Sequence, residues 1–414
     1  MITWRNGTVS RIRREWPGAV ELDVTISGPP GGPAAARHGA AGGQEAPALP
    51  VRALAYPELT GRPEPGDRVL LNTTALDLGL GTGGYALVVA VPDRLPPDRS
   101  GPGHLVKARY TPLQAVVLGA DEQGSPHHDT LRSADSIGGM PVVVADLHSA
   151  LPAVLAGLYA DTERRRGECP HAREDTLPPG TAPSQGMPLD LRGPDPGGPG
   201  RRPRVVYVMT DGGALPAWFS RTCAALREAG WLAGTVTAGQ AFGGDLEAVT
   251  LHTGLLAARH VLGADVAVVA QGPGNLGTGT TWGFSGVAAG EAVNAVAALA
   301  GRPVAALRVS EADPRERHRG VSHHSLTSYG RVALARADVV VPALPGEFGA
   351  RVAAEAEPLG RRHSLVRVEL DGLDEALRRC PAPLSTMGRG LDEDRVYFLA
   401  AAAAGRHAAA LLQA

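Results

Sequence analysis

From about Met140 onward, short β-branched runs alternate with longer runs rich in alanine and leucine, and this alternation constrains the fold most. It is typical of βαβ units, which build parallel sheets. The predicted strands are Val142–Ala145, Arg204–Met209, Leu232–Thr237, Asp265–Ala270, Pro303–Val309, Val339–Val341 and Leu365–Glu369. The predicted helices are Pro216–Ala229, Glu247–Leu262, Ser285–Ala300, Thr327–Ala337 and Gly346–Ala356. Because strands this apolar need cover on both faces, we predict a Rossmann-like α/β domain over residues 140–414, with a doubly wound, mostly parallel sheet.

The first part of the chain has a different pattern. Gly18–Ile26 alternates apolar and polar side chains, as a half-buried strand does. Val51–Ala55, Asp67–Asn72 and Tyr85–Val91 are similar short apolar segments separated by turn residues. Four or five such strands suffice for a small β-barrel-like domain, which we predict over residues 1–95, followed by a connecting segment over 96–139.

Two segments are dense in proline and glycine and carry few bulky apolar side chains. They cover about residues 28–50 and about residues 162–203. Such segments cannot bury enough apolar surface to form a core, so both are predicted to be insertions or linkers, the first of them disordered.

Composition excludes several classes of function. A net charge of −2 and an aromatic content of 4% count against nucleic-acid binding. The apolar run Phe398–Ala404 is too short to span a bilayer, and the first residues lack a secretory signal, so we expect a cytoplasmic protein without a membrane partner. The chain has a single lysine, Lys107, and lacks the lysine that a phosphate-binding Walker A loop requires.

Ligands of open parallel sheets bind beyond the carboxyl ends of the strands, so the loops after the predicted strands are candidate sites. Asp146 and His148 follow the first strand and could form an acid/base pair or share a metal, although Asp146 or Ser149 could simply cap a helix. Asp211 follows the second strand beside two glycines, either as a site carboxylate or within a tight turn.

The loop after the fourth predicted strand is rich in glycine. It contains Gly272, Gly274 and Gly277 in a GxGxxG pattern, followed by Thr278. In a dinucleotide-binding fold that pattern opens the first βα unit, which is not its place here. The loop is therefore either a backbone-amide cradle for a phosphate or carboxylate, or an ordinary long loop.

The loop after the fifth predicted strand is the densest in functional side chains. Three arginines (Arg315, Arg317, Arg319) and three histidines (His318, His323, His324) lie within ten residues. Arginine binds phosphate or carboxylate through two parallel hydrogen bonds, and histidine titrates near neutral pH. We expect the arginines to hold an anion and His323 or His324 to act as the acid/base, with a solvated charged loop as the alternative.

Several stretches resemble a family of bacterial proteins catalogued only as a numbered domain of unknown function. They are Leu54–Pro57, Gly66–Thr74, Gly103–Gln114, Val208–Pro216 and His318–Ser325. The resemblance covers most of the chain outside the two segments rich in proline and glycine. It implies one two-part protein and supplies no activity, cofactor or catalytic residue.

The residues favour an enzyme of the hydrolase or transferase type that acts on a small anionic substrate at the carboxyl edge of the sheet. That substrate would be phosphorylated, nucleotide-like or a carboxylate, and the sequence identifies neither a cofactor nor a metal. The alternative is a non-catalytic module for metabolite binding or assembly. Small residues in Ser285–Ala300 would also allow close helix packing across a homo-oligomer.

Overall fold

The computed structural model describes residues 2–27, 48–80, 83–168 and 202–413, with backbone only over 161–168. These residues form two compact units. The barrel unit comprises residues up to Pro102 together with Val106–Val116 and Trp218–Ala224, and the sheet unit contains the rest. Most of both predicted insertions lies outside the described residues. The structure corrects their edges, because a strand already begins at Ala48 and a helix continues to Glu168.

Five strands of the barrel unit form a closed barrel in the order β1-β2-β3-β5-β4. They are β1 (Trp4–Trp16), β2 (Ala19–Ser27), β3 (Ala48–Ala55), β4 (Arg68–Asn72) and β5 (Ala86–Ala90). Strands β3 and β5 are parallel and the other neighbours antiparallel, which gives the five-stranded Greek-key arrangement of OB-folds. Short helices α1 (Pro57–Thr60) and α2 (Thr74–Asp77) flank β4, and side chains such as Leu22 and Leu71 fill the interior. The predicted small all-β region is confirmed.

The sheet unit contains eight strands in the order β11-β10-β9-β12-β8-β13-β16-β17, and every neighbouring pair is parallel. They are β8 (Pro141–Val144), β9 (Val205–Thr210), β10 (Gly234–Ala238), β11 (Leu246–Ala248), β12 (Val266–Gln271), β13 (Arg302–Ala306), β16 (Asp338–Pro342) and β17 (Ser364–Val368). The predicted parallel sheet is confirmed. Strand β11 was not predicted and occupies the start of the predicted helix Glu247–Leu262.

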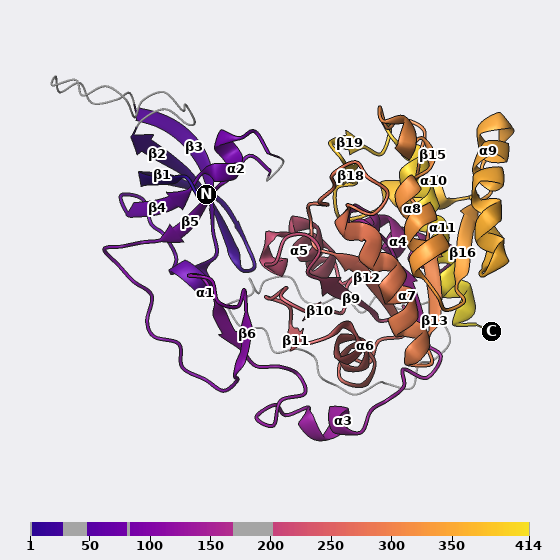
Figure 1. Ribbon diagram of the computed structural model, residues 1–414, viewed down its shortest axis with the longest axis horizontal. Helices are drawn as coiled ribbons and strands as arrows, with labels where there is room; N and C mark the ends of the chain where they lie inside the picture. The colour runs from indigo at the N-terminus through magenta and orange to yellow at the C-terminus, as the bar shows by residue number, and fades with distance from the viewer. Residues whose placement is uncertain (1, 28–47, 81–82, 169–201, 414) are drawn as a thin grey trace. The chain divides into compact units, whose positions relative to one another are not determined.

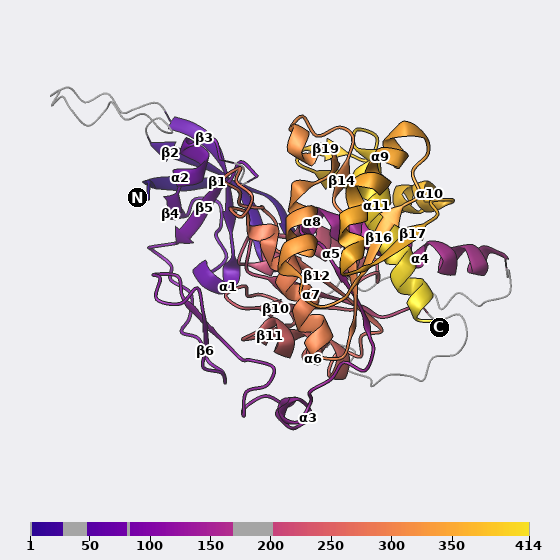
Figure 2. The same cartoon turned by 45° about the vertical axis from the view of Figure 1, so that its right-hand side comes forward.

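Helices pack against both faces of the central strands, which are buried along their whole length. One face packs against α6 (Leu251–His260), α7 (Ala288–Ala298) and α9 (Gly346–Ala356), and α6 and α7 lie side by side (Figure 1 and Figure 2). Helix α11 (Arg395–Leu411) contacts β8, β13 and β16 and also packs on α4 (Leu151–Glu168).

The contact between α4 and α11 depends on two glycines. A Cβ atom at Gly157 would lie 1.8 Å from the Ala402 carbonyl oxygen, and one at Gly405 would lie 1.9 Å from the Val154 carbonyl oxygen. Only glycine therefore permits this backbone approach. Helix α11 contains the apolar run Phe398–Ala404, which is buried inside the sheet unit. Among the described residues, no helix is both long and apolar enough to cross a membrane.

Several helix boundaries differ from the prediction. Helix α8 (His323–Thr327) and a π-helical turn (Ser328–Val332) replace the predicted helix Thr327–Ala337, because Ser322 caps an earlier start. Helix α5 (Arg221–Glu228) lies within the predicted Pro216–Ala229. The remaining elements are β6 (Leu105–Lys107), β7 (Ala115–Val117), α3 (His128–Arg132), α10 (Leu373–Arg378) and the hairpins β14 (Val309–Ser310)–β15 (Gly320–Val321) and β18 (Ser385–Thr386)–β19 (Arg389–Gly390).

Candidate functional site

The candidate site lies where three neighbouring strands end. Strand β8 lies between β12 and β13 in the sheet, and all three are parallel, so their carboxyl ends share one edge. Asp146 follows β8, the glycine-rich loop follows β12, and the arginine- and histidine-rich loop follows β13. This is the edge at which open parallel sheets bind their ligands.

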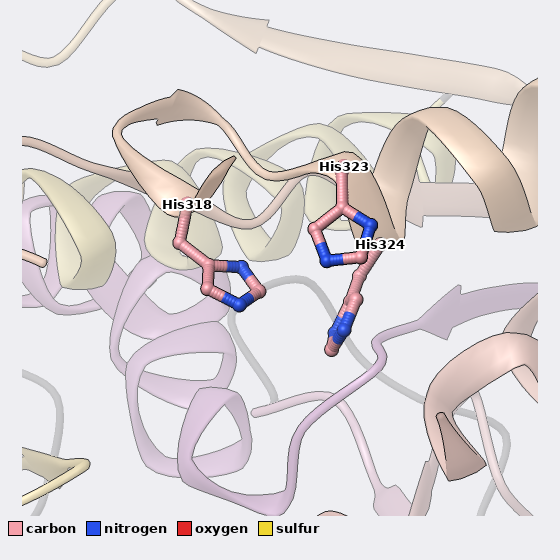
Figure 3. Close-up of side chains that lie close together, drawn as sticks. All are labelled: His318, His323 and His324. Carbon is pink, nitrogen blue, oxygen red and sulfur yellow. The ribbon is translucent and has the colours of Figure 1, made fainter. Parts of the chain in front are cut away.

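A small hairpin positions the histidines. Strands β14 and β15 pair Val309 with Val321 and Ser310 with Gly320, so the chain between them closes into a loop. His318 lies near the end of that loop. Ser322 then caps α8, with its hydroxyl accepting a hydrogen bond of 3.2 Å from the backbone N–H of His324. Figure 3 shows His318 approaching from the loop, while His323 and His324 come from the first turn of α8.

His318, His323 and His324 form a compact cluster. One ring nitrogen from each lies within 4.8 Å of the others, and the ring centroids are 4.4 to 5.0 Å apart. His318 and His324 are buried, whereas His323 is partly exposed. The cluster is therefore reachable from its His323 side.

The environment of the cluster disfavours positive charge on two of its imidazoles. Burial, reinforced by Arg308 and Arg315, lowers the pKa of His318 to about 3. Burial, then His324 and Arg317, lowers the pKa of His323 to about 4. Both imidazoles are therefore neutral at pH 7, so each has a lone pair that can bind a metal ion but cannot attract an anion by charge.

A buried ion-pair network lies next to the histidines. The Arg308 guanidinium lies 3.8 Å from Asp146 Oδ2 and 3.5 Å from Asp313 Oδ2, and all three side chains are at most 5% exposed. Arg315 also donates to Asp313 Oδ2 at 2.8 Å. Burial alone would raise the pKa of Asp313, but its hydrogen bonds from Arg315 outweigh burial and hold that pKa well below its usual value.

The network extends to the start of α11. Arg389 Nη2 lies 3.3 Å from Asp313 Oδ2 and 2.9 Å from Asp394 Oδ2. Asp394 also accepts a hydrogen bond of 2.8 Å from the Ser310 hydroxyl. Three carboxylates and three arginines from four separate parts of the chain therefore form one network, and their formal charges cancel.

His324 connects this network to the histidine cluster. Its Nδ1 lies 3.5 Å from Asp146 Oδ2 and 3.4 Å from Arg308 Nη1. Its ring stacks on Phe284, with centroids 3.8 Å apart and planes within 3° of parallel. The Arg308 guanidinium can only donate, so His324 Nδ1 is the acceptor of their contact, and the buried Asp146 Oδ2 accepts no hydrogen bond from the described residues.

Two of the predicted catalytic residues have hydrogen-bond partners outside the histidine cluster. His148 is buried, with Nδ1 2.9 Å from the Tyr207 hydroxyl, and burial lowers the pKa of His148 to about 4. Asp211 accepts a hydrogen bond of 2.8 Å from the backbone N–H of Gln240. At the preceding Gly239, where φ is +67°, a Cβ would lie 2.3 Å from Asp211 Oδ2. In this structure Asp211 therefore fixes the loop after β10, whereas Asp146, His323 and His324 come together.

The predicted anion-binding arginines differ in their environments. Arg315 is paired with Asp313. Arg317 is exposed, and its Nη2 lies 3.9 Å from the position of a Cβ at Gly279, so its guanidinium reaches the glycine-rich loop. Arg319 is also exposed, and its carbonyl oxygen accepts a hydrogen bond from Arg351.

The predicted residues of the glycine-rich loop also differ. A Cβ at Gly272 would lie 2.2 Å from the Ala214 carbonyl oxygen, so Gly272 has a packing role. Gly274 has φ +91° and no atom near its missing Cβ. Gly277 pairs with Phe284 in an isolated bridge, and the Thr278 hydroxyl lies 3.3 Å from both the Thr280 hydroxyl and the Gly283 carbonyl oxygen.

The residues of the site that were not predicted as such include Phe284, Arg308, Asp313 and Asp394. Arg308 had a usable signal, because it is a charged residue inside the apolar run Pro303–Val309. An uncompensated charge there would be costly, which indicates a buried partner. The other three carry no local signal.

A family model described as a protein of unknown function, DUF3866, matches residues 52–170 and 199–405. The chain therefore belongs to that family, which confirms the resemblance found in the sequence. The interval between the two matched ranges falls within the predicted insertion over 162–203. None of the curated proteins matches the chain.

Proposed function

We propose that this member of the DUF3866 family is an enzyme that acts on a small anionic substrate at the carboxyl ends of β12, β8 and β13. The observation that carries the proposal is a cluster of three histidines, two of them held neutral, against a buried ion-pair network. Neutral imidazoles have a free lone pair for a ligand, and strongly perturbed pKa values are typical of functional sites.

The ion-pair network supports a functional explanation over a purely structural one. Burying Arg308 with Asp146 and Asp313 removes all three charges from water, and such an arrangement contributes little net stability relative to apolar side chains of similar volume. A chain selected for stability alone has no need of it. A catalytic site does, because fixed charges orient the groups that react.

The substrate anion needs a different partner. Arg308 and Arg315 already pair with carboxylates, and His318 and His323 are neutral. Arg317 is exposed and reaches the glycine-rich loop. Within the glycine-rich loop the Leu276 and Thr278 amides already donate to Ser285 and Gly283. We therefore assign anion binding to the Arg317 guanidinium together with the backbone amides of Gly274, Gly277 and Gly279, while the histidine cluster faces the reacting group.

A thermal-shift screen of the full chain against nucleotides, sugar phosphates and small carboxylates tests this proposal. A ligand at 100 times its dissociation constant stabilises a protein by about 2.7 kcal/mol. We expect one class to stabilise the chain and Arg317→Ala to weaken binding by about 10-fold, the loss of one charge-assisted contact. Arg361→Ala, which removes an exposed arginine elsewhere, serves as the matched control.

Ligands that stabilise the chain are then incubated with it, and products are sought by mass spectrometry. Turnover that His323→Ala abolishes would support the enzyme. Stabilisation by none of the three classes, or equal binding by wild type and Arg317→Ala, would reject the assigned anion site. Arg317-dependent binding without product would instead favour the non-catalytic metabolite-binding module.

A further inference from the structure

We infer that His318, His323 and His324 bind a divalent transition metal, with Zn²⁺ as the ion that best suits the ligand set. The three side chains provide three nitrogens from one short stretch of chain, and their convergence is visible in Figure 3. The inference stands on this geometry and does not require the proposed enzyme activity.

The spacing of the nitrogens suits a metal after a small adjustment. Zinc binds imidazole nitrogen at about 2.0–2.1 Å in tetrahedral geometry, which separates the ligand nitrogens by about 3.3 Å. The nitrogens here lie within 4.8 Å of one another. A metal site therefore requires the three rings to approach one another by roughly 1.5 Å, and His323 is the one ring of the three that is not fully buried.

An oxygen atom lies on the Nδ1 side of two of the rings. His318 Nδ1 forms a hydrogen bond of 2.7 Å with the Ser322 hydroxyl, and His324 Nδ1 lies 3.5 Å from Asp146 Oδ2, which accepts no hydrogen bond from the described residues. With Nδ1 facing these oxygens, Nε2 is the nitrogen that a metal would take. Metal-binding histidines in proteins almost always have such an oxygen partner on the other ring nitrogen.

His323 supplies an independent observation. Its Nε2 is buried and has no hydrogen-bond partner among the described residues. A buried polar atom without a partner is costly and calls for an explanation, and a bound metal ion is one explanation. A metal bound by His318 and His324 would give this nitrogen its partner.

The ligand set also indicates the class of metal. Imidazole suits zinc, copper, iron and nickel, whereas calcium and magnesium prefer oxygen ligands. Three protein ligands leave a fourth position open, as in catalytic rather than structural zinc sites. The exposed side of His323 is where a water molecule or a substrate would reach that position.

The charge of such a site would favour an anion. Imidazole ligands are neutral, so the ion keeps its full charge, and the adjacent network of three carboxylates and three arginines has no net formal charge. A bound divalent ion would therefore make this part of the sheet edge cationic. That field complements the anionic substrate proposed above.

Metal titration of the full chain, stripped with a chelator, tests the inference without any substrate. Co²⁺ binding is followed by visible absorption, which distinguishes four or five ligands from six, and Zn²⁺ affinity by competition with a chromogenic chelator. We expect one equivalent of metal and the intense bands of low coordination. His323→Ala should weaken binding by at least about 10-fold, while His252→Ala, which removes an exposed histidine on α6, should leave it unchanged.

Two further variants distinguish the loss of a metal ligand from misfolding of the chain. His323→Cys keeps a ligand, so it should retain the metal and add a thiolate-to-cobalt charge-transfer band that no structural role of His323 would produce. Asp146→Asn removes the negative charge beside His324 Nδ1, so it should retain one equivalent with affinity lowered by about 10-fold. Asp146 would then be a positioning residue.

Absence of stoichiometric binding, or equal affinity in wild type and His323→Ala, would overturn the metal site. Arg317-dependent anion binding in a chain that takes no metal would leave the proposed function standing without this inference. A metal-binding chain that recognises none of the anion classes would leave the metal site standing and remove the proposed function.

Discussion

The barrel unit and the sheet unit each contain a cluster of arginines around carboxylates, and the two clusters differ in hydration. In the barrel, the Glu21 side chain is only 2% exposed. Its three partners remain 35 to 54% exposed; they are Arg13, Arg14 and Arg52. In the sheet unit, Arg308 is 3% exposed and its partner Asp313 is fully buried. The charges of the barrel arginines are still stabilised by water, whereas the Arg308 charge is stabilised almost entirely by its carboxylate partners. The same residue types are thus replaceable in one region and indispensable in the other.

Removal of Arg308 should have the largest effect on stability. Arg308→Met leaves Asp146 and Asp313 with one fewer positive partner in a site closed to water. Breaking a buried pair in this way typically costs about 3–5 kcal/mol. Urea denaturation of the variant should show a free energy of unfolding reduced by that amount. A loss below about 1 kcal/mol would mean that the two clusters are energetically alike.

The second-largest effect should be a loss of stability of the sheet unit at low pH. In the metal-free chain the folded-state pKa is about 3 for His318 and about 4 for His323 and His148, whereas unfolded histidine titrates near 6.5. Between these values the unfolded chain binds more protons, so this contribution to stability is complete above pH 6.5 and falls as the pH is lowered toward 4. Each fully buried histidine contributes at most about 1.4 kcal/mol per pH unit, and the partly exposed His323 contributes less.

The location of this acid sensitivity sharpens the comparison. The described residues of the barrel unit include no histidine, so peptides from β8, β12 and β13 should lose protection from hydrogen exchange first when pH 7 is compared with pH 5. The measured exchange rates are corrected for the intrinsic pH dependence of amide hydrogen exchange. His148→Asn should flatten part of the pH dependence. Earlier loss of protection in β1 to β5 would contradict the assignment.

The smallest change in the free energy of unfolding is expected for substitutions in the barrel. Arg14 lies 3.1 Å from Glu21 and is 54% exposed, while Arg13 and Arg52 remain beside the same carboxylate. Arg14→Gln should therefore change the free energy of unfolding by no more than about 0.5 kcal/mol. The same urea titration measures it. A loss as large as that of Arg308→Met would show that hydration does not distinguish the clusters.

The sequence predicted the sheet edge and its histidines because both depend on local patterns. Apolar strands followed by loops can be recognised in any short window of the sequence, and the loop that contains His318 is rich in arginine and histidine. The network around Arg308 is different. Its partners Asp313 and Asp394 are ordinary acidic residues until the hairpin and the start of α11 bring them together. Ser310 and Asp394 are 84 residues apart, so no local pattern could pair them.

Strands β1 and β11 were not predicted for a related reason. In β1 the pairing with β2 shifts between Val9 and Arg11 and again between Ile12 and Arg14. Each irregularity breaks the two-residue alternation by which a strand is recognised. Strand β11 has three residues, too few to show a period. In both cases the strand is defined by its partner rather than by its own sequence.

The place of β8 in the sheet also sets the order in which the site can be assembled during synthesis. Strand β8 is the first of the eight to leave the ribosome, yet its neighbours are β12 and β13, which are made only at residues 266–271 and 302–306. Strands β9, β10 and β11 can pair with one another while β8 still has both edges open. Open strand edges of this kind can pair with non-native strands. Asp146 consequently meets its arginine and histidine only when most of the polypeptide exists, so a truncated translation product would lack the site altogether.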